Sequence, residues 1–218
     1  MHIEILVEDQ SGQLLLGHLV PKIIGRHGSP HTWNIHGYKG IGKLPRNLEG
    51  TVAPNKRILL DRLPSLLRGF GRTPGIDAVV VVLDNDDRDC VTFLSELNGL
   101  LHQCRPSPVT LFRLALEEIE AWCIGDKRAV RAAYPTFRDR VLNTYAQDSC
   151  CGTWEILADA IHPGGSHTLK KAGWPIPGQV KCEWANRIGP LLDIEHNDSP
   201  SFTKLREGLR RVVSRSRA

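Results

Sequence analysis

The hydrophobic and polar residues of the first 125 positions follow two alternating patterns. Short apolar runs rich in β-branched residues predict strands, and longer segments with apolar residues at helical spacing predict helices. The predicted strands are 2–8, 31–36, 77–84 and 109–115, and the predicted helices are about 14–24, 54–70 and 88–103. The order of these elements predicts an α/β fold: a mainly parallel four-stranded sheet flanked by helices, with right-handed crossovers.

Two of these segments carry more specific expectations. The run Ala78–Leu83 is apolar throughout, which is typical of a strand buried on both faces of a parallel sheet. In the helix at 88–103, the spacing predicts a buried face formed by Val91, Leu94, Leu97 and Leu101.

The pattern changes after about residue 125, where no further strand is predicted. Short helices are expected at about 126–135, 153–161 and 180–192, and residues 197–201 form a cap before a last helix. The sequence therefore predicts two parts, an α/β domain over 1–125 and a C-terminal helical appendage over 126–218 packed on it.

Acidic residues follow three of the four predicted strands. Glu8 ends the first strand, Asp84 and Asp86 end the third, and further glutamates lie at 117–120 after the fourth. If the third strand continues to residue 86, Asp84 and Asp86 leave the same face about 7 Å apart. Carboxylates this close repel unless a cation or a proton lies between them. Because the carboxyl ends of parallel strands share one edge, the convergence favours a divalent-metal site.

A simpler interpretation of the acidic run after the third strand stays open beside the metal site. Aspartate is favoured at helix N-caps, so Asp87 or Asp89 could cap the helix that starts at about residue 88. The glutamates at 117–120 could likewise be the acidic first turn of a helix. These local roles are compatible with a metal site.

The loop after the second strand contains two lysines within a glycine-rich segment, residues 37–43. It lacks the GxxxxGK[ST] spacing of a phosphate-binding P-loop. Lys39 and Lys43 are therefore candidates for contacts to a substrate phosphate, while an ordinary solvent-exposed loop is the simpler interpretation.

Charge and composition narrow the choices only slightly. The chain has 28 basic and 24 acidic residues, and the excess is concentrated near its C-terminus. This balance is compatible with a nucleic-acid partner without requiring one. No secretory signal is recognised and no apolar run approaches the ~20 residues of a membrane helix, so we expect a cytoplasmic protein without a membrane partner. The six cysteines show no CxxC spacing and are expected to be reduced thiols; Cys150 and Cys151 stay open as a redox or metal pair.

The acidic strand ends resemble the Toprim catalytic core, a fold shared by topoisomerases, primases and nucleases of the overcoming-lysogenization-defect class. That family has a glutamate at the end of its first strand and Asp-x-Asp at the end of its third. The matching residues here are Glu8 and Asp84-Asn85-Asp86. Asp9 stands where the family has a glycine after the glutamate.

The whole chain is similar to the bacterial family named domain of unknown function 4276. The likeness includes Leu-Asp-x-Asp-x-x-Asp-Cys at 83–90, Glu-x-Glu-Ala-Trp at 118–122, and a C-terminal set with Lys181, Trp184-Ala185 and 197–202. It covers nearly the full length. The resemblance implies a Toprim-like fold. It also implies a genomic link to ATPases of the ABC or AAA type and a role in defence against phages.

The leading hypothesis is a Mg²⁺- or Mn²⁺-dependent phosphodiester nuclease acting on DNA or RNA. Oxygen-only ligands suit these hard cations, so Asp84 and Asp86 would hold the metal. Glu8 would be the general acid or base, or a ligand of a second metal. At most two of the three glutamates at 117–120 can point inward from a helix, and the resemblance favours Glu120 as a further metal ligand.

Three other functions stay open at this point. The chain could be a Toprim-like partner subunit of an ABC- or AAA-type ATPase, without independent catalysis. A receiver-like phosphoacceptor would use Glu8 and Asp9, but no lysine follows the strand at 109–115. A zinc hydrolase would need paired histidine ligands, and no HExxH spacing is present. A homo-oligomer is compatible with each of them.

Overall fold

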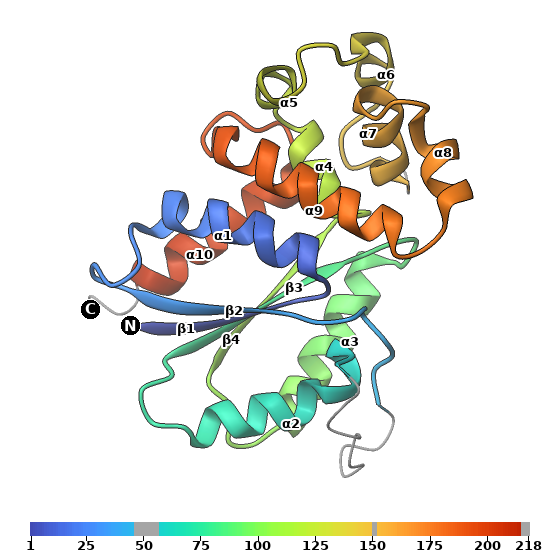
Figure 1. The fold of residues 1–218 in the computed structure, drawn as a ribbon. Helices are drawn as coiled ribbons and strands as arrows, with labels where there is room; N and C mark the ends of the chain where they lie inside the picture. Colours follow the sequence, from blue (N-terminus) through green and yellow to red (C-terminus); the bar gives the residue numbers. More distant parts are fainter. Residues whose placement is uncertain (46–56, 150–151, 215–218) are drawn as a thin grey trace.

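The computed structural model describes residues 1–45, 57–149 and 152–214. Its centre is a four-stranded sheet in the order β2-β1-β3-β4, with every neighbouring pair parallel (Figure 1). The strands are β1 His2–Val7, β2 Thr32–Gly37, β3 Ala78–Asp84 and β4 Val109–Ala115. The α/β fold with a parallel four-stranded sheet is thereby confirmed.

Helices cover both faces of this sheet. On one face lie α1 Gln10–Ile24, α9 Ile176–Ile188 and α10 Pro200–Ser214, with α9 packed on α1 and α10 packed on α1 and β4. On the other face lie α2 Leu59–Arg72 and α3 Cys90–Gln103 (Figure 1). The sheet thus separates two hydrophobic clusters, each closed by its own helices.

The central strand β3 serves both clusters at once. Val80 and Val82 pack into the cluster with α1, whereas Val79 and Val81 pack into the cluster with α2 and α3. All seven residues of β3 are buried. This double burial is the physical reason for its unbroken apolar run.

The helices beyond residue 125 complete the first of these clusters. After α4 Glu120–Ile124 come α5 Lys127–Ala133, α6 Asp139–Asn143, α7 Thr153–Ile161, α8 Gly165–Ala172, α9, the short 3-10 helix Gly189–Leu191 and α10. Trp184 of α9 and Leu205 of α10 belong to the same buried cluster as Ile5 of β1 and Leu15 of α1. The division at residue 125 stays a prediction, and the apolar core is continuous across it.

The buried face predicted for α3 is confirmed at Leu97 and wrong at Val91, while Leu94 and Leu101 are partly buried and pack against the hydrophobic cluster on this side of the sheet. Val91 is 73 % exposed, and the fully buried positions are Phe93, Leu97 and Leu100. Phe93, Leu97 and Leu100 follow the i, i+4, i+7 spacing of one helix face. Val91 lies two residues before Phe93, about 200° around the helix axis, and therefore points to solvent.

Several boundaries also differ from the sequence prediction. The helix expected at 54–70 begins at Leu59, and positions 54–56 lie outside the described residues. The helix expected at about 180–192 begins earlier, at Ile176, and ends at Ile188. The short helices α6 and α8 were not predicted, because segments of five and eight residues carry little periodicity.

Side-chain caps are present at the starts of three helices, and those at Asp89 and in residues 197–201 were predicted. The Asp9 carboxylate accepts a hydrogen bond from the Gly12 amide at the start of α1. Asp89 accepts one from the Thr92 amide at the start of α3, and the Ser199 hydroxyl accepts one from the Phe202 amide at the start of α10.

Two composition-based expectations can also be compared with the structure. Cys90, Cys104, Cys123 and Cys182 are free thiols, whereas Cys150 and Cys151 lie outside the described residues. Within the described ranges, the helices are all too short or too polar to cross a bilayer.

Candidate active site at the carboxyl edge of the sheet

A pocket of about 860 Å³ opens at the carboxyl edge of the sheet. Its acidic side is lined by Glu8 after β1, by Asp84 and Asp86 around the end of β3, and by Glu118 after β4. Further lining residues come from the segment 174–182, which includes the first two turns of α9. The pocket therefore lies between the sheet edge and a helix from the C-terminal half of the chain.

Glu8 and Asp84 form the buried acidic floor of this pocket. Burial raises the pKa of Glu8 to about 7, with Asp86 and Asp9 adding to the rise. Asp84 is buried, and burial together with the Glu8 charge raises its pKa well above the usual range. Asp84 Oδ1 accepts a hydrogen bond from the Ile119 amide, whereas Glu8 Oε2 is buried without a hydrogen-bond partner. The fold therefore neutralises this pair of carboxylates only in part.

Asp86 reaches the pocket by a route that strand alternation did not predict. The strand ends at Asp84, and Asp86 has a φ of 49°, in the left-handed region. Its amide donates to the Glu117 carbonyl, which fixes the turn. Burial raises the pKa of Asp86, although the Arg88 guanidinium at 3.6 Å opposes the rise. A turn, and not a common strand face, brings Asp84 and Asp86 to one pocket.

The three glutamates after β4 point to three different places. Glu117 has a φ of 72° and accepts a hydrogen bond from the Tyr145 hydroxyl. Glu118 lines the pocket and accepts from the Trp154 amide at 2.9 Å. Glu120, the residue favoured from sequence, is buried and is not among the residues that line the pocket. Because α4 begins only at Glu120, a helical face could not be used to choose among them.

Lys181 is a site residue that the sequence analysis did not assign. It projects from α9 into the space between the acidic residues, with its Nζ 3.2 Å from Glu120 Oε1. Burial alone would lower the pKa of Lys181, but the charges of Glu120, Glu118 and Asp84 raise it overall, so the ammonium stays charged. The available sequence signal was the spacing. Lys181 lies four residues after Pro177 and three before Trp184, on the same buried face of α9.

The two loop lysines are separated by the fold. Lys39 lines the pocket together with Gly40. Lys43 lies in a different hollow of about 610 Å³, which it forms with Glu96, Gly99 and Leu100 of α3. Only Lys39 is therefore placed to contact a ligand bound at the acidic floor.

The pocket matches a divalent cation in donor chemistry. Glu8, Asp84 and Asp86 offer only oxygen atoms, the donors that Mg²⁺ and Mn²⁺ prefer. The buried Glu8 Oε2 without a partner and the raised pKa values both indicate uncompensated negative charge. Across residues 1–45, 57–149 and 152–214, no three histidine, cysteine or acidic side chains are already close enough together to enclose a metal. The donor atoms are of the type that these cations prefer, but the described side chains are not already arranged around a metal position.

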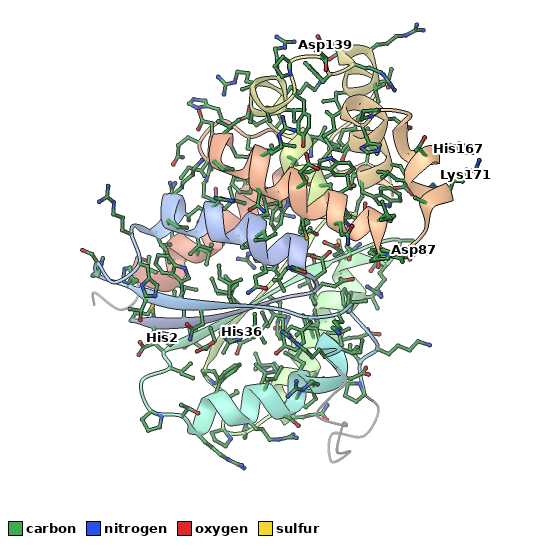
Figure 2. The ribbon with its side chains drawn as sticks, in the orientation of Figure 1. His2, His36, Asp87, Asp139, His167 and Lys171 are labelled. Carbon is green, nitrogen blue, oxygen red and sulfur yellow. The ribbon has the colours of Figure 1, made fainter. Side chains whose placement is uncertain are left out.

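Another buried carboxylate, Glu4, lies on β1 outside the pocket, in a cluster with two histidines and an asparagine. Glu4 of β1 is buried and accepts hydrogen bonds from His2, His36 and Asn34. Burial alone would raise the pKa of Glu4, but these hydrogen bonds lower it below the usual value. Figure 2 shows His2 and His36 on the side of the sheet that α2 covers. The residues of this cluster satisfy one another.

Comparisons of the chain with family models, curated proteins and solved structures find no match. The likeness to Toprim enzymes and to domain of unknown function 4276 therefore stays a prediction from the motifs.

Proposed function

We propose that this chain is a divalent-metal-dependent phosphodiester nuclease of the Toprim type. One observation carries the proposal: Glu8, Asp84 and Asp86 converge from two adjacent strand ends on one pocket, with their charges only partly compensated. A structural cluster would be expected to satisfy its carboxylates internally, as the Glu4 cluster does. Sites of open α/β sheets also lie at this edge.

The pocket residues would divide the chemistry between them. Asp84 and Asp86 would hold Mg²⁺ or Mn²⁺; a bound metal of this kind polarises a phosphoryl oxygen and lowers the pKa of a water. Glu8 has a pKa of about 7, which suits a general acid or base near neutral pH. Lys39 would contact a substrate phosphate. Lys181 would keep Glu118 and the floor carboxylates ionised and in position.

We further propose nucleic acid, DNA or RNA, as the substrate, and an ABC- or AAA-type ATPase as a partner in defence against phages. A substrate phosphate carries negative charge into an acidic pocket, so a metal and Lys39 are both needed to bind it. The proposed substrate therefore depends on the proposed metal.

The direct test is cleavage of labelled single- and double-stranded DNA and RNA with Mg²⁺ or Mn²⁺. We expect Glu8→Gln and Asp84→Asn each to lower the cleavage rate by about 10²–10⁴-fold, the usual effect of losing a group that acts on the reacting atoms. Glu4→Gln is the matched control, because it changes the same chemical group on the same strand outside the pocket.

The outcomes separate the proposal from its alternative. Cleavage at the wild-type rate by both pocket variants would exclude the assignment of Glu8 and Asp84. A wild-type chain that binds metal but cleaves none of the substrates alone would favour the partner-subunit function. The assay would then be repeated with an ABC- or AAA-type ATPase from the same genome added.

A further inference from the structure

An exposed tryptophan lines the same pocket as the carboxylates. Trp174 lies in the turn between α8 and α9 and is 78 % exposed, the highest value among the exposed large hydrophobic side chains of the described residues. It lines the same pocket as Glu8, Asp84 and Lys39. An indole exposed to this extent loses hydrophobic stabilisation unless a ligand covers it.

The position of the indole is fixed by the helix that follows it. A Cβ atom added to Gly178, in the first turn of α9, would lie 2.6 Å from Cζ3 of Trp174. The six-membered part of the indole therefore rests against the glycine backbone, where any larger residue would displace it. This contact supports the ring from one side and leaves most of its surface free.

The chemistry of the pocket identifies the kind of group that the ring would contact. Gln179, Lys39 and the acidic floor give the pocket polar groups, and Trp174 adds apolar surface beside them. A nucleotide matches both parts, because it presents a phosphate to a metal or a lysine and a flat aromatic base to an indole. The volume of about 860 Å³ lies within the range of about 300–1,000 Å³ typical of small-ligand sites.

The accessibility of the base limits the substrate further. Bases inside a duplex are stacked on both sides by their neighbours, so an aromatic side chain can stack only on a base that is unpaired or at an end. We propose that Trp174 stacks on an unpaired base of a single-stranded nucleic acid whose phosphate lies at the acidic floor. This inference rests on the proposed nuclease function and gives its substrate class.

The test measures binding, so that it does not depend on cleavage. Fluorescein-labelled single strands of about twelve nucleotides, within the ~4–16 nucleotides of single-strand sites, are titrated with the full chain and followed by fluorescence anisotropy. Separate arms use DNA, RNA and a blunt DNA duplex, with Ca²⁺ in place of Mg²⁺ to limit cleavage. The proteins are wild type, Trp174→Ala, Trp174→Phe and Leu191→Ala. Leu191 is 46 % exposed and lies outside the pocket, so it controls for loss of an exposed apolar side chain.

We expect Trp174→Ala to weaken single-strand binding about tenfold or more, which is the usual effect of losing one base–aromatic stack. Trp174→Phe keeps a flat ring and should stay within about threefold of wild type. Leu191→Ala should bind as wild type. Wild type should bind the duplex more weakly than the single strands, and this difference should shrink in Trp174→Ala, which lacks the stacking ring. The DNA and RNA arms identify the preferred strand.

Three results would overturn the inference: no single-strand binding by wild type, equal binding by Trp174→Ala and wild type, or an equal loss in Leu191→Ala. The same measurements, combined with the cleavage assay, test the nuclease proposal separately from the stacking site. Binding that depends on Trp174 without any metal-dependent cleavage would keep the stacking site and remove the nuclease. Cleavage that depends on Asp84 but is insensitive to Trp174→Ala would keep the nuclease and remove the stacking site.

Discussion

Glu4 lies in β1, and Glu8 directly follows the end of that strand. The two residues have the same side chain but opposite environments. Glu4 is buried among His2, His36 and Asn34, and their hydrogen bonds lower its pKa. Glu8 lies four residues later at the carboxyl edge, where burial and nearby acidic groups raise its pKa to about 7. Glu4 therefore has hydrogen-bond partners within the fold, whereas Glu8 keeps a buried oxygen without a hydrogen-bond partner.

The difference separates a structural carboxylate from a candidate functional one. A buried charge with complete hydrogen bonding adds stability, whereas buried like charges reduce stability unless another group neutralises them. The Glu8 end of the strand therefore costs stability in the isolated chain. Such costs are typical of sites that are completed by a ligand. Three predictions test this interpretation, from the largest expected effect to the smallest.

The largest effect is expected for Lys181→Met, which removes the buried cation from the acidic edge. Its partner Glu120 would be left buried and unpaired, so we expect the free energy of unfolding to fall by about 3–5 kcal/mol at pH 7. Urea denaturation at equilibrium measures the change. The double variant Lys181→Met with Glu120→Gln should recover much of the loss, because it also removes the carboxylate that Lys181 pairs with.

A surface pair on the same helix provides the control. Glu183 and Arg187 of α9 are joined at 3.2 Å, but both side chains are about half exposed. Arg187→Met should therefore lower stability mainly through the hydrogen bond from its Nη2 to the Ala133 carbonyl, by about 1 kcal/mol. An effect of Lys181→Met as small as this one would show that the buried pair contributes little.

Opposite effects are expected for Glu4→Gln and Glu8→Gln at pH 8 without metal. Glu4 has a lowered pKa, so its contribution to stability is present above its unfolded value and is lost as pH falls. Glu8 has a raised pKa, so its contribution is present below about 4.5 and is lost as pH rises through about 7. We expect Glu4→Gln to destabilise by about 2 kcal/mol and Glu8→Gln to stabilise by about 2 kcal/mol.

Urea denaturation of both variants and wild type between pH 5 and 8 measures these effects. The stability gained by Glu8→Gln relative to wild type should grow as pH rises to about 7 and then level off, because between about 4.5 and 7 the unfolded chain ionises Glu8 while the folded chain keeps it protonated. Equal destabilisation by the two substitutions at every pH would contradict the comparison between Glu4 and Glu8.

The smallest effect is the response to metal. A ligand that binds only the native state raises its stability, by about 1–2 kcal/mol at a concentration near ten times the Kd. For a chain of this size, millimolar Mg²⁺ or Mn²⁺ should raise the Tm of wild type and Glu4→Gln by about 2–8 °C. Asp84→Asn with Asp86→Asn should show no rise. A rise of equal size in that double variant would place the metal elsewhere.

Much of the fold was predictable because β-strands and capped helices are local patterns. The buried strand β3 and the caps Asp9 and Asp89 follow from neighbouring residues, so the sheet and its helical layers were found. The phase of α3 was not, because Val91 and Phe93 are both apolar and only the packing on the sheet selects one of them.

The site was predictable only where strand order alone decides it. Glu8 and Asp84 line one pocket because adjacent parallel strands end at the same edge. The choice between Glu118 and Glu120 depended on a turn that the sequence does not mark. Lys181 comes from nearly one hundred residues farther along the chain than Asp84, in a region predicted only as helical. Tertiary packing, and no local motif, brings it to the acidic edge.

The origin of the two sides of the pocket limits how this protein can be divided or recombined. The acidic side belongs to residues 1–125, while Lys181 and Trp174 belong to the helix and turn contributed by the C-terminal part of the chain. A fragment ending near residue 125 would keep the carboxylates but lose the buried ammonium beside them. A chimaera between related chains would have to exchange α9 together with the ends of β1 and β3. These distant segments therefore have to be kept or exchanged together.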